Sequence, residues 1–557
     1  MPVNKSGILW SPPIRRACFN IPPADAPALS PNQLPTFLAP RSAAVPTPPP
    51  KPRPAPASAT PTAPLIPDPG VGPGPGSAAE PNGGGGGGGE VGGGGLRGRV
   101  LRGGGFMVGR QAIGIVVSLV GVILVTRIIG PGQYGRFAAC VGVFTYFNYL
   151  CGWGIDIYLM RQPEDQAPRR LFDQAFTLMM GLAVLAAGVG LLLTRPLEAL
   201  VDVAGFGPMV AVFFLGLPVA MAAFVPRVLL ERDLNYRAIA VIELITLFQF
   251  QTTALLLAYL GWQAWSLIVS WAVNQLLALG LVIAAARYRP RLAWSWSATR
   301  DMLRFGLGYT ASTCTIQMRT LINPLIVAPF AGVTAAGFVG MAIMFVFRLS
   351  IVKTMSEKMA VAALAKVQDR RPRVRELLGE GMRLHVLCVG LPLAAFAWVG
   401  PWLIPWLMGS EWRPVADLVP LIAVGFLVNA VFSLHSSVLQ IYRRNWDVAI
   451  FNAVLMAILF GASLVLVPRI GFIGYGWAEV LTLPAYLLIH AFLTRQVGRP
   501  DYTVSLVWTL GLALLMLSPW LGWPALAAGG AVLVWPTTWR SLAEHWQQFR
   551  GAGMIRA

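Results

Sequence analysis

Charged residues are scarce in this chain. Asp, Glu, Lys and Arg make up 12% of its 557 residues, whereas 55% are hydrophobic and the mean hydropathy is +0.62. A soluble domain carries about twice that charged fraction. Apolar segments of about 20 residues recur from Phe106 almost to the C-terminus, and each is long enough to cross a bilayer. The sequence therefore predicts an all-α polytopic membrane protein rather than a barrel of short alternating strands.

Several signatures of site chemistry are also missing. The five cysteines form no CxxC pair, and four lie in apolar spans, where a small buried hydrophobic side chain is the expected role. A GxxxxGK[ST] loop is absent, which argues against direct use of ATP, and so is a DxD motif. No metal or other cofactor is predicted. The net charge of +19 does not indicate nucleic-acid binding, because the basic residues gather in alternate loops, as orientation in a membrane requires.

The N-terminal stretch has a different composition. Residues 1–99 are rich in Pro, Ala and Gly, cannot bury a core and are predicted to be a disordered tail. Two alternatives stay open. The stretch is a Pro-rich interaction arm, or it is not translated because synthesis begins near Val100 or Met107. No cleaved signal peptide is expected, because the span from Phe106 follows three arginines and is too long for an h-region.

About fourteen membrane spans are predicted after this tail. Their expected limits are 106–129, 136–160, 172–194, 208–230, 238–260, 262–286, 305–329, 335–353, 384–408, 417–440, 446–467, 472–493, 503–518 and 522–538. The first twelve form two six-helix halves, residues 100–290 and 300–495. Because six is even, both halves insert in the same orientation, and a pseudo-two-fold axis along the membrane normal relates them. Residues 502–540 add two C-terminal helices, and 541–557 form a cytoplasmic tail.

A phrase that occurs twice supports the two halves. Residues 124–138 and 326–340 each contain the end of one apolar span, a glycine turn and the start of the next. The aligned glycines are Gly130 with Gly332 and Gly135 with Gly337. Such glycines end one helix and let another pack closely.

The loops predict the topology. Basic residues follow every even-numbered span, while the loops at 260–261, 331–333 and 521–522 contain neither Lys nor Arg. Both termini are therefore expected in the cytoplasm. The longest loop, about 354–383, is basic and is predicted to include an amphipathic helix that lies on anionic lipid.

The first hairpin, TRIIGPGQYGRFA, is similar to that of polysaccharide exporters. These are the Wzx-type oligosaccharide flippases of the multidrug/oligosaccharidyl-lipid/polysaccharide (MOP) superfamily. Their usual phrase is an Arg, two apolar residues, Gly-Pro and then Tyr-Gly, matched by Arg127, Gly130, Pro131, Tyr134 and Gly135. The second hairpin fits the family pattern at Gly332, Gly337, Ala342, Arg348 and Leu349.

The resemblance covers about residues 100–540. It implies a flippase that moves an undecaprenyl-diphosphate-linked oligosaccharide across the bacterial inner membrane by alternating access, for O-antigen or exopolysaccharide biosynthesis. Membrane lipids, a polysaccharide polymerase and glycosyltransferases are the partners it implies.

Four intramembrane arginines are candidates for binding the diphosphate. A diphosphate needs cations beside it, and a cation kept near the bilayer centre is a functional candidate because it is costly there. Arg319 lies halfway along its span, just before Asn323-Pro324, which is predicted to kink the helix. The other candidates are Arg348, Arg127 and Arg110. The alternative for each is a pair with a nearby acid or contact with a lipid headgroup.

Three acids lie inside spans: Asp156, Glu243 and Glu479. Each either neutralises an arginine in a buried pair or takes up protons or Na⁺ and couples export to a gradient. Two other functions stay open. A drug/cation antiporter of the same superfamily would need acids in its cavity, and a membrane glycan polymerase, ligase or glycosyltransferase would usually carry a large outward loop.

Overall fold

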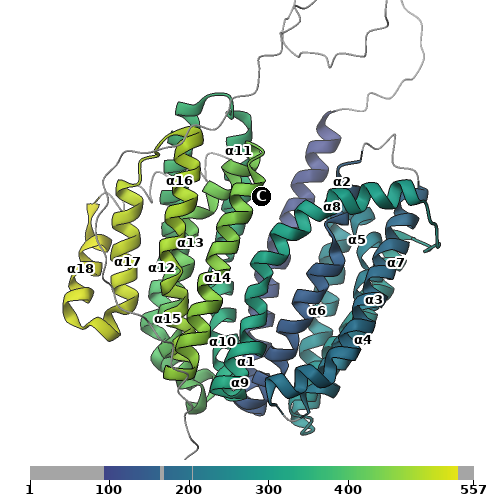
Figure 1. Ribbon diagram of the computed structural model, residues 1–557, viewed down its shortest axis with the longest axis horizontal. Coiled ribbons are helices and arrows are strands. Elements are labelled where there is room, and N and C mark those ends of the chain that lie inside the picture. The colour runs from purple at the N-terminus through teal and green to yellow at the C-terminus, as the bar shows by residue number, and fades with distance from the viewer. Residues whose placement is uncertain (1–92, 163–168, 204, 537–557) are drawn as a thin grey trace, which may run out of the picture. The chain divides into compact units, whose positions relative to one another are not determined.

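The computed structural model describes residues 93–162, 169–203 and 205–536, with side chains from residue 114 onward. Within that range, the side chains of 308, 309, 312, 352, 354, 355, 358, 359 and 362 are not described. All regular structure in the described part of the chain is helical, which confirms the predicted fold class (Figure 1). The predictions for residues 1–92 and for the tail at 541–557 fall outside the described residues.

The N-terminal half runs from α1 to α7. Its helices are α1 (Gly93–Gly152), α2 (Ile155–Met160), α3 (Arg169–Val201), α4 (Phe206–Ala222), α5 (Phe224–Arg232), α6 (Tyr236–Tyr259) and α7 (Ala264–Ala286). Helix α1 contains a break at Gly130, whose φ of 74° and ψ of 171° are not helical, so α1 comprises the first two predicted spans. Contacts with α4, α6 and α7 surround α1 and make it the packing centre of this half.

The C-terminal half runs from α8 to α16. It consists of α8 (Trp296–Gln317), η2 (Met318–Leu321), η3 (Asn323–Val327), α9 (Ala328–Ala331), α10 (Val333–Leu349), α11 (Ile351–Lys366), α12 (Arg371–Met408), η4 (Ser410–Trp412), α13 (Arg413–Ile441), α14 (Asn445–Ile470), α15 (Ile473–Leu481), η5 (Leu483–Ala485) and α16 (Tyr486–Val497). Helix α13 packs against α10, α12, α15 and α16 and is the most buried of the membrane-length helices. The basic loop does contain a helical segment, α11, while the predicted amphipathic helix on anionic lipid stays a prediction.

Two further helices, α17 (Thr503–Leu521) and α18 (Trp523–Val534), close the chain and agree with the predicted C-terminal pair. Helix α17 packs on α12 and α13, and α18 packs on α17. Just before the N-terminus of α17, the Tyr502 hydroxyl lies 2.6 Å from His435 Nε2 and 2.8 Å from His490 Nδ1. Burial raises the pKa of Tyr502, which keeps the hydroxyl protonated. It therefore donates to one imidazole and accepts from the other, and so joins α17 to α13 and α16.

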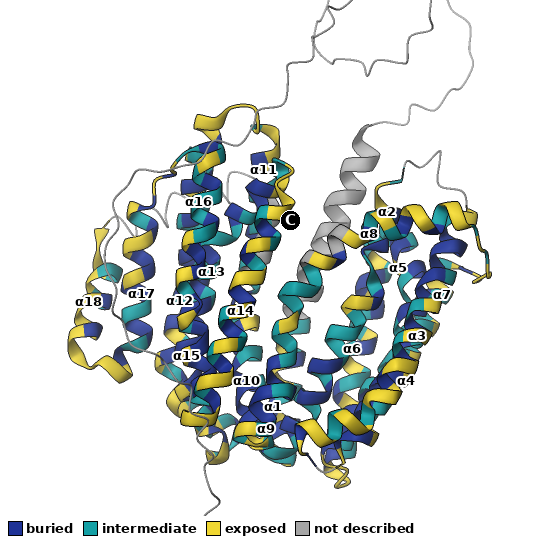
Figure 2. Cartoon of the chain, viewed as in Figure 1, coloured by how far each residue is buried: buried dark blue, intermediate teal, exposed yellow. Residues whose placement is uncertain are grey.

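Ten helices of the described chain are long and apolar enough to cross a membrane. Helices α10 and α18 are shorter apolar helices, and the seventh predicted span is divided among α8, η2, η3 and α9. Exposed residues are spread along the bundle (Figure 2). Many of them are large apolar residues, among them Leu192 and Tyr259, which are 81% and 82% exposed. Lipid tails satisfy such side chains. The protein is therefore a multi-pass membrane protein, and the count of fourteen spans stays a prediction.

The two repeated hairpins pack directly against each other. A Cβ atom on Gly135 would lie 1.9 Å from the Val333 carbonyl oxygen, and one on Gly337 would lie 2.2 Å from the Pro131 carbonyl oxygen. The turn glycines also adopt matching conformations, with φ of 74° at Gly130 and 89° at Gly332. The contact is reciprocal, as a two-fold relation between the hairpins produces. The glycines are needed there because the backbones touch.

Candidate functional site

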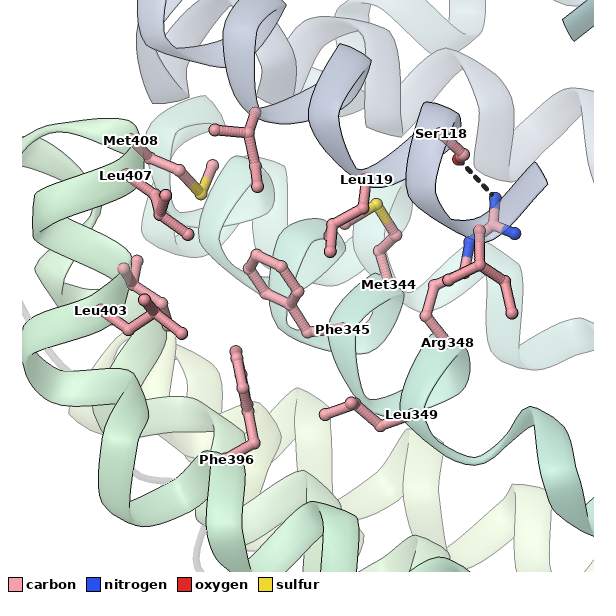
Figure 3. A pocket seen from close by; sticks show the side chains of 13 residues that line it. Ser118, Leu119, Met344, Phe345, Arg348, Leu349, Phe396, Leu403, Leu407 and Met408 are labelled. Atoms are coloured by element: carbon pink, nitrogen blue, oxygen red, sulfur yellow. Dashed lines mark hydrogen bonds between the residues drawn. The ribbon is translucent and has the colours of Figure 1, made fainter. Parts of the chain in front are cut away.

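A pocket lies where the two halves meet, between α1, α10 and α12. It has a volume of about 230 Å³, and apolar side chains form most of its wall, including Leu119, Phe345 and Phe396 (Figure 3). Ser118 and Arg348 are its polar residues. The pocket can therefore accommodate an apolar chain with one cation at its edge.

Arg348 is held at this edge by the other half of the protein. Its Nη2 donates a hydrogen bond to Ser118 Oγ at 3.0 Å, and the side chain is exposed (Figure 3). Arg348 comes from the last turn of α10, whereas Ser118 is a buried residue of α1. The hydrogen bond fixes the guanidinium beside the pocket without neutralising its charge, which leaves the cation available to an anion.

Arg127 lies near the hairpin contact. It is exposed, and its Nη1 donates a hydrogen bond to the Leu407 carbonyl oxygen at 3.3 Å. Because Leu407 belongs to α12, this bond also joins the two halves. The fourth candidate, Arg110, is in α1, and its side chain lies outside the described residues.

Arg319 lies where the seventh predicted span departs from the α-helix. The 3-10 turn η2 carries this residue, and the π-helical segment η3, which begins at Asn323, follows it. The predicted distortion at Asn323-Pro324 is thus present. Helix α1 passes so close that a Cβ on Gly142 would lie 2.4 Å from the Thr320 carbonyl oxygen. The turn that carries Arg319 therefore packs directly against the N-terminal half.

Arg319 forms an ion pair with Glu479 of α15. Arg319 Nη2 lies 2.5 Å from Glu479 Oε1, and the guanidinium carbon is 5.1 Å from the centre of the Phe426 ring. The Tyr475 hydroxyl donates to the same carboxylate oxygen at 2.5 Å. One residue predicted to bind substrate and one predicted to couple ions are thus direct partners.

The other two acids lie in the N-terminal half. Glu243 accepts a hydrogen bond from Arg227 Nη2 at 2.7 Å, and Arg227 also pairs with Glu231. Asp156 lies in the first turn of α2 and is half-buried. Neither acid is brought to Arg319 or to the pocket.

Sequence reasoning singled out Glu479 but not the other partners of these arginines. Ser118, Tyr475 and Phe426 are ordinary residues of apolar spans. A signal was present in the seventh span, where residues 310–320 read TASTCTIQMRT, with hydroxyl, amide and guanidinium groups at seven of eleven positions. Such polarity inside a span indicates a helix that faces a polar space rather than lipid.

The fold is that of a known flippase structure. The lipid II flippase MurJ, in an inward closed conformation, superposes with a TM-score of 0.56 at 10% identity, covering 81% of this chain and 99% of that one. At this identity the likeness concerns the fold alone. It defines the class as a helical membrane protein with the same fold.

The family follows from the sequence comparison. The model of the polysaccharide biosynthesis protein family matches residues 124–417, more than half of the chain, and this protein belongs to that family. The predicted relationship to Wzx-type polysaccharide exporters is thereby confirmed.

Two relatives carry names that describe related proteins. The succinoglycan biosynthesis transport protein ExoT of Rhizobium meliloti strain 1021 is 26% identical over 222 residues, 40% of this chain and 44% of that protein. The lipopolysaccharide biosynthesis protein WzxC of Escherichia coli K12 is 22% identical over 356 residues, 63% of this chain and 71% of that protein. The chain thus matches less than half the length of ExoT.

Proposed function

We propose that this protein is a flippase for a lipid-linked oligosaccharide in the bacterial inner membrane. The cargo is a glycan on undecaprenyl diphosphate, which the protein moves from the cytoplasmic to the outer leaflet for assembly of a surface polysaccharide. Its termini lie in the cytoplasm, and a polymerase and glycosyltransferases act on the same glycan.

The observation that carries this proposal is the charge at the junction of the halves. Arg348 borders an apolar pocket that no acid lines in the described part of the chain, and Arg319 lies on the turn that packs against the N-terminal half. A diphosphate is met by guanidinium groups, which offer two parallel hydrogen bonds, while a polyprenyl tail prefers an apolar surface. The pocket and Arg348 together match the two chemically different ends of such a molecule.

Two of the three acids in the spans pair with arginines, which favours an anionic cargo over a cationic one. Glu479 is neutralised by Arg319, and Glu243 pairs with Arg227. A cation carrier instead presents acids to its cargo. Transport by alternating access fits the two halves, which meet at small, symmetric hairpins.

The test is the leaflet position of the lipid-linked glycan in cells depleted of the protein. We expect it to accumulate on the cytoplasmic face, with loss of surface polysaccharide, and wild-type protein to restore both. Arg348→Gln should fail to restore export at normal expression, and Arg348→Lys should restore it in part, since an ammonium is a point charge without the guanidinium fork. Normal outward exposure of the glycan in depleted cells would overturn the proposal.

A further inference from the structure

The two residues of the Arg319–Glu479 pair differ in solvent exposure. The Arg319 side chain is 25% exposed, whereas that of Glu479 is 4% exposed. The carboxylate lies behind the guanidinium, with Tyr475 as its second donor. Arg319 is therefore the more exposed member of the pair, and Glu479 is almost fully covered.

The backbone around Arg319 is suited to movement. The helical hydrogen-bond pattern changes from α to 3-10 at Met318 and to π at Asn323. Such irregular turns within a helix often mark functional hinges. Thr320, next to Arg319, touches α1 at Gly142. A shift of this turn would therefore displace the backbone of α1 in the other half.

The fold itself does not require the pair. Arg319 stands thirteen residues before Gly332, and the residue thirteen before Gly130 in the other half is Val117. Glu479 stands eight residues after Gly471, and the residue eight after Gly261, the corresponding positive-φ glycine, is Val269. The N-terminal half thus has two valines at the equivalent places. The ion pair is an addition to one half, and a buried pair is weak evidence of a stabilising role.

We propose that Glu479 is a resident counter-anion, which holds Arg319 while the transporter is empty and which the diphosphate of the cargo displaces. The inference rests on the proposed function and assigns Glu479 a role in cargo affinity. A diphosphate offers more charge and more acceptor oxygens than a carboxylate, so it competes successfully for the guanidinium. When the cargo leaves, Glu479 pairs with Arg319 again, so the guanidinium is not left buried without a counter-charge. The competition weakens cargo binding and so permits release.

The test measures diphosphate binding directly. The probe is farnesyl diphosphate, titrated by calorimetry into the purified full-length protein in nanodiscs, with farnesyl monophosphate for comparison. Glu479→Gln removes the competitor and should tighten diphosphate binding about tenfold, whereas Arg319→Gln should weaken it by at least that factor. The double variant should bind like Arg319→Gln, because no cation is left to release, and this non-additivity is the signature of competition.

Glu231→Gln is the matched control, because Glu231 also pairs with an arginine but lies away from this pair. It should leave binding unchanged. Glu479→Asp keeps the charge and withdraws it by one methylene, so it should tighten binding by an intermediate factor, and it serves if the Gln variant does not fold.

Two results would overturn the inference: diphosphate affinity unchanged in both Glu479 variants, or affinity lowered as in Arg319→Gln. In the second case the carboxylate would position the guanidinium for the cargo instead of competing with it. Failure of the proposed function looks different. The wild-type protein would then show no preference for diphosphate over monophosphate, whichever way the Glu479 variants behave.

Discussion

The contact between the two hairpins predicts a large effect from a single methyl group. In Gly135→Ala the new Cβ would lie 1.9 Å from the Val333 carbonyl oxygen, and in Gly337→Ala 2.2 Å from that of Pro131. The neighbour in each case is backbone, so relief requires the hairpins to separate. Overpacking of this kind costs about 1–3 kcal/mol. Because each 1.4 kcal/mol is a factor of about ten, the population with the hairpins in contact should fall about 5- to 150-fold relative to the separated one.

The helix preference of alanine does not offset this cost. It favours Ala over Gly by up to about 1 kcal/mol, but it applies equally whether the hairpins touch or not. The two substitutions act on one shared contact, so their effects should not add. The double variant is expected to resemble the stronger single variant.

The assay is the distance between spin labels placed on the two halves at the hairpin end. Trp262, in the α6–α7 turn, and Trp406, in the last turns of α12, are 50% and 72% exposed and tolerate labels, with the native cysteines replaced. Gly337→Ala should shift the distances upward and lower export, since under the proposed alternating access each cycle re-forms the contact. Gly188→Ala, in α3 with nothing within 4 Å of its Cβ, is the matched control.

The reasoning is refuted if Gly135→Ala and Gly337→Ala both give the distances and the export of Gly188→Ala. The hairpin contact would then accommodate a methyl group without a change in the conformational equilibrium. Lower export with unchanged distances would also refute it, because the loss would have another cause.

Three smaller effects are expected elsewhere. Ser118→Ala removes the hydrogen bond that fixes Arg348, which is worth about 1 kcal/mol, and should slow export about fivefold with normal expression, as measured by surface polysaccharide. Tyr502→Phe leaves two imidazoles without their shared partner and should lower stability by about 1–3 kcal/mol in thermal unfolding, whereas Tyr259→Phe at an exposed site should not. The backbone N–H of Thr503, at the start of α17, donates to Asp501 and lowers the pKa of that carboxyl. The contribution of Asp501 to stability is therefore present at neutral pH and is lost as the pH falls through the lowered pKa. Thermal midpoints between pH 7 and 3 should therefore fall less steeply in Asp501→Asn.

The fold was predictable from the sequence because membrane insertion leaves few alternatives. Apolar length set the spans, and the repeated glycines located the hairpins, whose backbone contact allows no side chain at Gly135 or Gly337. Helix limits were less accurate than the order of the spans. The second span, predicted from 136, already begins at Pro131, because proline fits the first turn of a helix.

The partners of the charged residues were not predictable in the same way. Arg319 and Glu479 are 160 positions apart in the sequence, and nothing in either segment indicates that η2 and α15 face each other. The sequence left open a pair with an acid for Arg319 and a pair with an arginine for Glu479, beside their separate roles toward the cargo and an ion, and the structure makes the two residues one pair. Ser118 was missed for a related reason, since a lone serine in an apolar span has no distinguishing pattern.

The two halves are alike in backbone and unlike in charge. The hairpin contact depends on glycines that both halves supply, as the proposed alternating access of two equivalent halves would require. The charges do not follow this symmetry. The positions of the N-terminal half that are equivalent to Arg319 and Glu479 hold valines, and the position equivalent to Arg348 holds Tyr146. A symmetric cargo would not need this difference. The proposed cargo, with a charged diphosphate at one end and an apolar tail at the other, is asymmetric, and it is matched by a scaffold that places Arg319 and Arg348 in the same half.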